Sequence, residues 1–189
     1  MASGGVAHRR KAAVVLVDVI NRFDFDGGDA LVRRFRPVAK RIVALKRRAS
    51  AARVPIVYAN DNFGAWRSDF RAIVRSCHEP GSRAPDLVDS LAPDDDDYFV
   101  LKPKNSAFFH TALESLLNDL GAHELVIAGI AADNCVLFTA HDAYLRQYVL
   151  HVPRDCVVAE SAQRMTRALG IMETTFKANL TPSPRLRFR

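Results

Sequence analysis

The sequence predicts a doubly wound α/β protein, in which a mainly parallel sheet carries helices on both faces. Short runs rich in Val, Ile and Leu alternate along the chain with longer segments of helical spacing. These runs are almost continuously apolar, which is typical of strands buried on both faces of a parallel sheet. No internal repeat, linker or low-complexity segment interrupts the alternation. We therefore expect a single domain over residues 12–189, preceded by a flexible tail over residues 1–11.

The first part of the chain predicts two strands and a helix. Residues 12–19 form a β-branched and apolar run that predicts the first strand, and residues 54–59 predict the second. The polar, Gly-rich residues 23–29 are typical of a loop. Pro37 lacks the N–H that an interior helical position donates, so we place it first in a helix that continues to about Ala52.

The middle of the chain is more irregular. Residues 66–77 have helical spacing, and residues 86–91 allow one short helical turn within a loop. The four aspartates at 94–97 predict a solvated turn. Residues 98–101 then predict a third strand, with Lys102 at its carboxyl end.

The last part of the chain returns to a regular alternation. Residues 109–120 predict a helix that Gly121 stops. Two further strands are expected over residues 124–130 and 148–152, and they alternate with helices over residues 133–146 and 160–176. The remaining residues predict an irregular or edge-strand segment.

The cysteines and the N-terminal region exclude several classes of protein. Cys77, Cys135 and Cys156 lack CxxC spacing, so they indicate neither a disulfide framework nor a cysteine zinc site, and they fit a reducing cytoplasm. The apolar run that ends at Asp18 is too short for a secretion signal or a membrane span. We therefore expect a soluble, cytoplasmic protein without a membrane partner.

The net charge of +6 gathers in one segment, since no acidic residue lies between Ala30 and Asn60. Basic residues from Arg33 to Arg53 alternate there with an apolar stripe, which is typical of a helix whose charged face meets water. A basic face can bind nucleic acid, but no nucleic-acid-binding motif accompanies this one. Nucleic acid is therefore not the expected partner.

Asp18, Lys102 and Cys135 fall at the carboxyl ends of the first, third and fourth expected strands. In doubly wound sheets the active crevice lies at the carboxyl ends of the strands, so one crevice could gather all three. Taken singly, each has an ordinary structural explanation, as a buried cap, an edge lysine or a small apolar residue. Their shared position favours a joint chemical role.

The chemistry of this set is that of an activated thiol. Cys135 lies where a strand turns into a helix, and a helix N-terminus lowers the pKa of a thiol. Asp18 can take the thiol proton, and the ammonium of Lys102 can stabilise the thiolate. His141 lies six residues further along the same helix, about 240° around its axis, and therefore faces elsewhere.

Three blocks of the sequence carry a resemblance to a known family: residues 16–23 (LVDVINRF), residues 101–108 (LKPKNSAF) and residues 129–135 (GIAADNC). They are similar to the signature blocks of the isochorismatase-like cysteine hydrolases, and the resemblance extends roughly from residue 11 to residue 176. It implies a six-stranded, mainly parallel sheet and a triad of Cys135, Asp18 and Lys102. It also implies a cis peptide between Ile130 and Ala131, which aims the N–H groups of Ala131 and Cys135 into an oxyanion hole.

Departures from the branches of that family narrow the chemistry. Nicotinamidases have an Asp-x-His motif and a further histidine that bind a metal after the second strand, whereas this chain has no histidine there until His78. We therefore expect no metal and no cofactor. True isochorismatases cleave a vinyl ether without needing the cysteine, so the presence of Cys135 favours acyl chemistry.

The resulting hypothesis is a cysteine hydrolase that cleaves a C–N bond of a small amide-type substrate through a thioester. A vinyl-ether hydrolase and a non-enzymatic module that binds through the Arg33–Arg53 face remain the alternatives. Apolar side chains suited to a pocket, or equally to the core, are Phe23, Phe63, Trp66 and Phe138. The family resemblance also implies a homo-oligomer.

Overall fold

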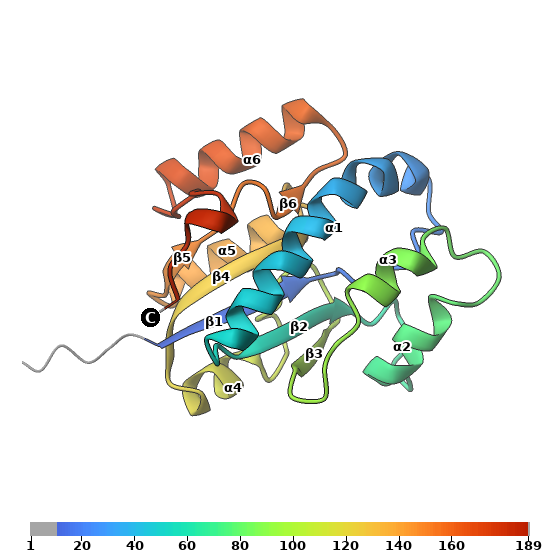
Figure 1. Ribbon diagram of the computed structural model, residues 1–189, viewed down its shortest axis with the longest axis horizontal. Helices are drawn as coiled ribbons and strands as arrows, with labels where there is room; N and C mark the ends of the chain where they lie inside the picture. Colours follow the sequence, from blue (N-terminus) through green and yellow to red (C-terminus); the bar gives the residue numbers. More distant parts are fainter. Residues whose placement is uncertain (1–10, 189) are drawn as a thin grey trace, which may run out of the picture.

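The computed structural model describes residues 11–188, in which six parallel strands form one sheet (Figure 1). The strand order is β3-β2-β1-β4-β5, and β6 pairs with β4 beyond the end of β5. This arrangement confirms the expected parallel sheet. The strands are β1 (Lys11–Val17), β2 (Ile56–Asp61), β3 (Tyr98–Lys102), β4 (Ala122–Ile130), β5 (Val149–His151) and β6 (Val157–Val158).

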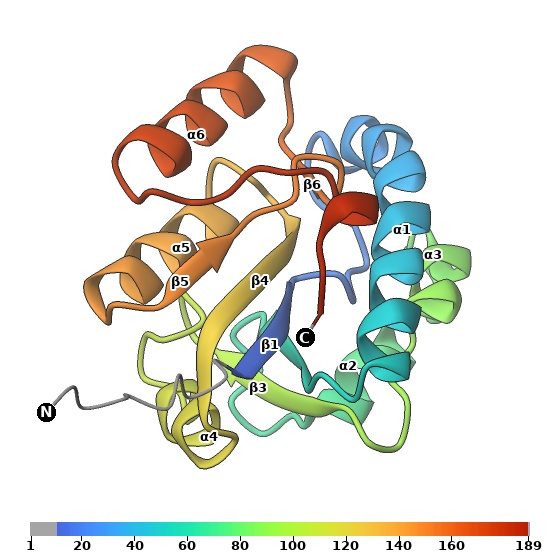
Figure 2. The same ribbon diagram turned by 60° about the vertical axis from the view of Figure 1, so that its left-hand side comes forward.

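Helices cover both faces of the sheet, as Figure 2 shows most directly. One face carries α1 (Gly28–Ala51), α2 (Phe70–Ser76) and α3 (Pro85–Ser90), and the other carries α4 (Leu113–Asp119), α5 (Cys135–Leu145) and α6 (Ala162–Thr174). A short 3-10 helix, η1 (Ser183–Arg185), lies near the C-terminus.

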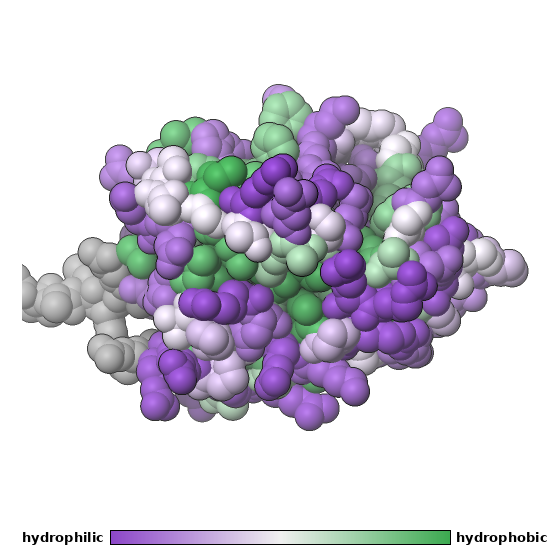
Figure 3. All heavy atoms as spheres, turned by 90° about the horizontal axis from the view of Figure 1, so that it is seen from above, coloured by the Kyte–Doolittle hydropathy of each residue, from purple (hydrophilic) through white to green (hydrophobic). Residues whose placement is uncertain are grey.

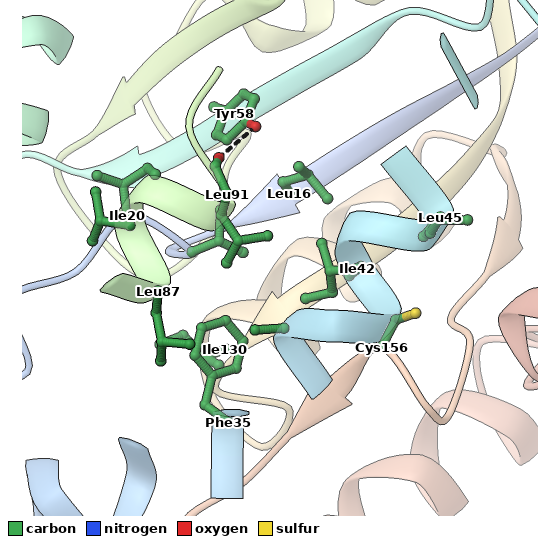
Figure 4. Packing of buried hydrophobic residues seen from close by; sticks show 14 of the residues in the cluster. Leu16, Ile20, Phe35, Ile42, Leu45, Tyr58, Leu87, Leu91, Ile130 and Cys156 are labelled. Atoms are coloured by element: carbon green, nitrogen blue, oxygen red, sulfur yellow. Dashed lines mark hydrogen bonds between the residues drawn. The ribbon is translucent and has the colours of Figure 1, made fainter. Parts of the chain in front are cut away.

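The core consists of two apolar layers, one on each face of the sheet. Successive side chains of a strand point to opposite faces, so Val14 and Leu16 pack under α1 while Val15 and Val17 pack toward α5. Figure 4 shows side chains of α1 and α3 packed against the strands in the first layer. Both layers are needed because the sheet is apolar on both sides.

The first helix begins earlier than the sequence predicts. It starts at Gly28, and Pro37 lies inside it rather than at its first position. A proline inside a helix costs about 3 kcal/mol. The buried side chains of Leu31, Val32 and Phe35 fix the preceding turns to the core, and this packing outweighs the cost of the proline.

Two expected helices are shorter in the structure, and the residues lost from them form loops. The helix expected over residues 66–77 is α2, which begins only at Phe70, where the Asp69 side chain caps it by accepting the Ala72 N–H at 2.6 Å. The helix expected over residues 109–120 is α4, which begins at Leu113. The flexible tail expected over residues 1–11 lies outside the described residues except for Lys11, which already belongs to β1.

Three of the nine basic residues from Arg33 to Arg53 bind other parts of the fold. Arg36 pairs with Asp86, and Arg48 donates hydrogen bonds to the carbonyl groups of Ser183 and Leu186. The buried ammonium of Lys46 pairs with Asp94 at 3.0 Å and Asp97 at 2.8 Å. The solvated turn expected at residues 94–97 therefore also has a structural role, because two of its aspartates pair with a buried lysine.

The surface seen from above in Figure 3 mixes hydrophilic side chains with smaller apolar areas. Within residues 11–188 no helix combines the length and the apolar character that crossing a membrane requires.

Gly129 allows the two central strands to approach each other at the carboxyl edge of the sheet. It lies opposite Val17 in the β1–β4 pairing and has a φ of +127°. A Cβ atom at this position would lie 2.0 Å from the carbonyl oxygen of Val17. No side chain fits there without moving the backbone of β1.

We expect Gly129→Ala to lower the free energy of unfolding by about 3 kcal/mol or more, because it adds a backbone clash to an unfavourable φ. Gly170→Ala is the matched control: Gly170 is exposed inside α6 with nothing within 4 Å of the added Cβ, so the substitution should stabilise by up to about 1 kcal/mol. Urea unfolding followed by circular dichroism measures both. Equal effects of the two substitutions would contradict this account of Gly129.

Candidate active site

The structure brings Asp18, Lys102 and Cys135 together at the carboxyl edge of the sheet. Asp18 directly follows β1, Lys102 ends β3, and Cys135 is the first residue of α5, which follows β4 after a short turn. Because β2 lies between β1 and β3, the long side chain of Lys102 reaches over its end toward Asp18.

The ammonium of Lys102 is the centre of the cluster. Its Nζ atom lies 2.9 Å from Asp18 Oδ2, 3.5 Å from Cys135 Sγ and 3.6 Å from Asp61 Oδ2. It also donates to the backbone carbonyl of Lys104 at 3.3 Å. The Lys102 side chain is fully buried and that of Asp18 is 8% exposed, so these charges interact with little screening by water.

The backbone fixes the carboxylate of Asp18. Its Oδ1 atom accepts the Asp61 N–H at 2.7 Å, which leaves Oδ2 for Lys102. Asp18 has a φ of +51°, an uncommon conformation for a residue other than glycine, and its own N–H donates to the carbonyl of Ala59 at 3.0 Å. Two contacts from β2 therefore hold Asp18 in one orientation.

Burial sets the protonation of the resting site. Burial raises the pKa of Asp18 above its usual range, although the nearby Lys102 charge opposes this. Burial lowers the pKa of Lys102, but the charge of Asp18 and its hydrogen bond with Lys102 oppose this effect, and the net shift is upward. Burial and the Asp18 charge together raise the pKa of Cys135 to about 12.

The expected lowering of the thiol pKa by the helix N-terminus is therefore wrong for the resting site. Desolvation of the sulfur and the neighbouring carboxylate outweigh the effect of the Lys102 ammonium on this pKa. The thiol of Cys135 is therefore neutral in the resting site, and it lies beside Asp18, whose raised pKa increases its affinity for a proton.

The turn before Cys135 is tied to its surroundings on both sides. The peptide bond between Ile130 and Ala131 is cis. The Ala132 N–H donates to the carbonyl of Val158 in β6 at 2.8 Å, and the carbonyl of Ala131 accepts the N–H groups of Asn134 and Val136. These bonds leave the turn little freedom.

A side chain further along the turn adds a link to α6. Asp133 pairs with Arg164, near the start of that helix, and is only 11% exposed. The turn that carries Cys135 is thus held by α6 as well as by β6.

A cavity of about 720 Å³ adjoins the cluster and lies between two loops. One loop follows β2 and the other follows β3, and Asp61 and Lys104 join the cavity to Lys102. Its volume is in the range of small-molecule pockets. The lining residues are Asp61, Asn62, Phe63, Gly64, Ala65, Trp66, Ser68, Leu101, Pro103, Lys104, Phe109 and His110.

Only two of the four expected pocket side chains line this cavity, namely Phe63 and Trp66. Phe23 is wrong as a pocket wall, because it is fully buried in the core, where its ring packs against Phe35 at 5.9 Å. Phe138 is half exposed on α5 and does not line the cavity.

Three further residues line the cavity from the loop after β3 and were not expected from the sequence: Lys104, Phe109 and His110. Their position just beyond a strand that ends in Lys102 is the signal that could have found them. Elsewhere, His141 packs against Phe176, away from Cys135. Among residues 11–188, no three His, Cys, Asp or Glu residues gather closely enough to hold a metal ion.

Comparison with known proteins places the chain in a family. The family model of the isochorismatase domain matches residues 12–182. The uncharacterized isochorismatase family protein YaaI of Bacillus subtilis (strain 168) is 41% identical over 169 residues, which are 89% of this chain and 92% of that protein.

Two further comparisons are with amidases. Ureidoacrylate amidohydrolase RutB of Pantoea ananatis is 46% identical over 63 residues, which are 33% of this chain and 25% of that protein. The crystal structure of N-carbamoylsarcosine amidase from Thermoplasma acidophilum has the same fold, with a TM-score of 0.72 and 23% identity over 94% of this chain and 99% of that one. The domain match and the extended similarity to YaaI together show that this chain belongs to the isochorismatase family.

Proposed function

We propose that this isochorismatase-family hydrolase cleaves a C–N bond of a small amide-type molecule, with Cys135 as the nucleophile and a thioester as the intermediate. The observation that carries the proposal is the position of Lys102 Nζ, 2.9 Å from Asp18 Oδ2 and 3.5 Å from Cys135 Sγ. The carboxyl group of Asp18, the ammonium of Lys102 and the thiol of Cys135 lie together beside residues that line a cavity, and this arrangement is suited to acyl transfer.

In the first half of the reaction, Asp18 accepts the proton of the Cys135 thiol as the sulfur attacks the substrate carbonyl carbon. The N–H groups of Ala131 and Cys135 stabilise the oxyanion that forms. The C–N bond then breaks, and the proton held by Asp18 passes to the departing nitrogen. Lys102 stays protonated and stabilises the negative charge on the sulfur and on Asp18.

In the second half, water replaces the released amine. Asp18 takes one proton from the water as its oxygen attacks the thioester carbonyl. The C–S bond breaks, the proton returns to the sulfur, and the product leaves as a carboxylic acid. The cycle ends with the neutral thiol and the carboxylate with which it began.

Two observations support an amide substrate over a vinyl ether. Cys135 is in direct contact with Lys102, whereas vinyl-ether hydrolysis needs no thiol nucleophile. The relative RutB from Pantoea ananatis is named an amidohydrolase.

We expect Cys135→Ala to abolish release of ammonia or amine from the best substrate in a screen of small amides, ureides and lactams, because no other group can form the acyl-enzyme. Cys135→Ser should retain a small fraction of the wild-type activity, since a hydroxyl is a much weaker nucleophile than a thiol. Cys77→Ala removes a buried thiol distant from the site and should keep most of the activity.

The same set of variants distinguishes the alternative chemistry. Full activity in Cys135→Ala combined with loss of activity in Asp18→Ala would overturn the proposal and favour hydrolysis of a vinyl ether.

The pH dependence of kcat/KM should follow the ionisation of Asp18. The carboxylate must be ionised to accept the thiol proton, so activity should fall as the pH is lowered through the pKa of Asp18. Burial raises this pKa, so the fall should occur above the usual aspartate value of about 3.9. We expect no further rise in kcat/KM near pH 9, because the pKa of the Cys135 thiol is raised to about 12.

Initial rates across the pH range, with circular dichroism as a control for unfolding, measure this profile. An acidic limb at or below about pH 4, or a rise near pH 9 like that of an ordinary thiol, would contradict the role of Asp18.

A further inference from the structure

Of the charged side chains that line the cavity, the acidic one has partners, whereas a basic one has no ion-pair partner among residues 11–188. Asp61 is its one acidic lining residue, and both oxygens of that side chain already have partners: Oδ2 lies 3.6 Å from Lys102 Nζ, and Oδ1 accepts the Phe63 N–H at 2.6 Å. Lys104 is exposed and forms no ion pair with any carboxylate of residues 11–188. The lining of the cavity therefore includes Lys104, a lysine without a paired carboxylate among the described residues.

The apolar walls of the cavity are also only partly covered. Phe63 is 52% exposed, Trp66 is 79% exposed and Phe109 is 46% exposed. Three aromatic side chains on the rim of one cavity offer flat apolar surface to a small ligand, and covering that surface is favourable.

The chain path connects this ammonium to the reacting groups. The carbonyl oxygen of Lys104 lies 3.3 Å from Lys102 Nζ, so the backbone of Lys104 is beside the cluster, and Lys104 also lines the cavity. A flexible four-carbon stem separates the Lys104 ammonium from this backbone position and allows it to bind a group away from Cys135. A ligand that reached both would carry its amide and its anionic group at opposite ends.

We infer that the substrate of this site is an amide that also carries a carboxylate, which the ammonium of Lys104 binds while the aromatic rim covers the apolar part between the two groups. This inference rests on the proposed function for the identity of the reacting group. Lys104 acts here as a specificity-determining residue, and it takes no part in the bond-breaking steps.

The test measures binding without turnover, in the Cys135→Ala protein. Trp66 is the only tryptophan of the chain and lines the cavity, so its fluorescence reports a ligand there, and calorimetry gives an independent measurement. The probes are 4-carbamoylbenzoate and terephthalamide, which have nearly the same shape. The first carries a carboxylate where the second carries a neutral amide.

We expect 4-carbamoylbenzoate to bind roughly tenfold more tightly than terephthalamide, as one charged hydrogen bond would give. Adding Lys104→Gln should remove this preference by weakening only the carboxylate ligand. Adding Lys40→Gln, which removes an equal charge from the exposed surface of α1, should leave the preference intact. Added salt should reduce the preference, because Lys104 is exposed.

Equal binding of the two probes, no saturable binding of either, or a preference that survives Lys104→Gln would overturn the inference. Failure of the proposed function has a different signature. A wild-type enzyme that binds 4-carbamoylbenzoate through Lys104 but releases no ammonia from any amide would keep the carboxylate site and refute the amide chemistry.

Discussion

Lys102 and Asp18 meet as opposite charges where almost no water reaches them, with the lysine side chain fully buried and that of the aspartate 8% exposed. Removing two charges from water is expensive, and the cost is offset only when geometry and additional hydrogen bonds are favourable. Here the pair is 2.9 Å long, the second oxygen of Asp18 accepts a backbone N–H, and Lys102 has further partners in Asp61 and the Lys104 carbonyl.

The order of the strands follows from the same constraint. β2 lies between the strands that supply Asp18 and Lys102, and its end contacts both: the Asp61 N–H binds Asp18, and the Asn62 N–H donates to the carbonyl of Lys102 at 3.1 Å. On the other side of β1, Gly129 lets β4 approach closely and carries the chain toward Cys135. The parallel sheet thus delivers three chemical groups from three separate segments to one point.

Burial of the sulfur, together with the nearby Asp18 carboxyl, explains why the thiol rests neutral. An exposed cysteine at a helix N-terminus would ionise more readily, but Cys135 shares a dry site with a carboxylate, and its pKa is raised to about 12. In the proposed reaction, the proton would therefore leave the thiol during the attack rather than before it. Asp18 is suited to receive it, because burial raises its own pKa and so increases its affinity for a proton.

The positions of Asp18, Lys102 and Cys135 could be predicted because each follows an apolar run, and the ends of parallel strands meet at one edge. The residues that line the cavity could not be predicted in this way. Trp66 and Phe109 stand at helical spacing before apolar residues, so their segments were predicted as helices, whereas the structure leaves both side chains exposed in loops.

Other differences also depend on tertiary packing. In the sequence, nothing distinguishes Phe23 from the aromatic residues that line the cavity. Its burial and its packing against Phe35 show that it belongs to the core. The two-residue strand β6 is too short to carry a pattern, and it exists because β4 offers it an edge beyond β5.

Mass spectrometry of the intact protein, quenched in acid during turnover of a slow amide substrate, tests whether Cys135 forms a thioester with the substrate. We expect an added mass equal to the acyl part of the substrate, located on Cys135 by peptide mapping and absent from Asp18→Asn, which lacks the proton acceptor. Turnover without any adduct under conditions that slow the hydrolysis of the thioester, or an adduct on another residue, would contradict it.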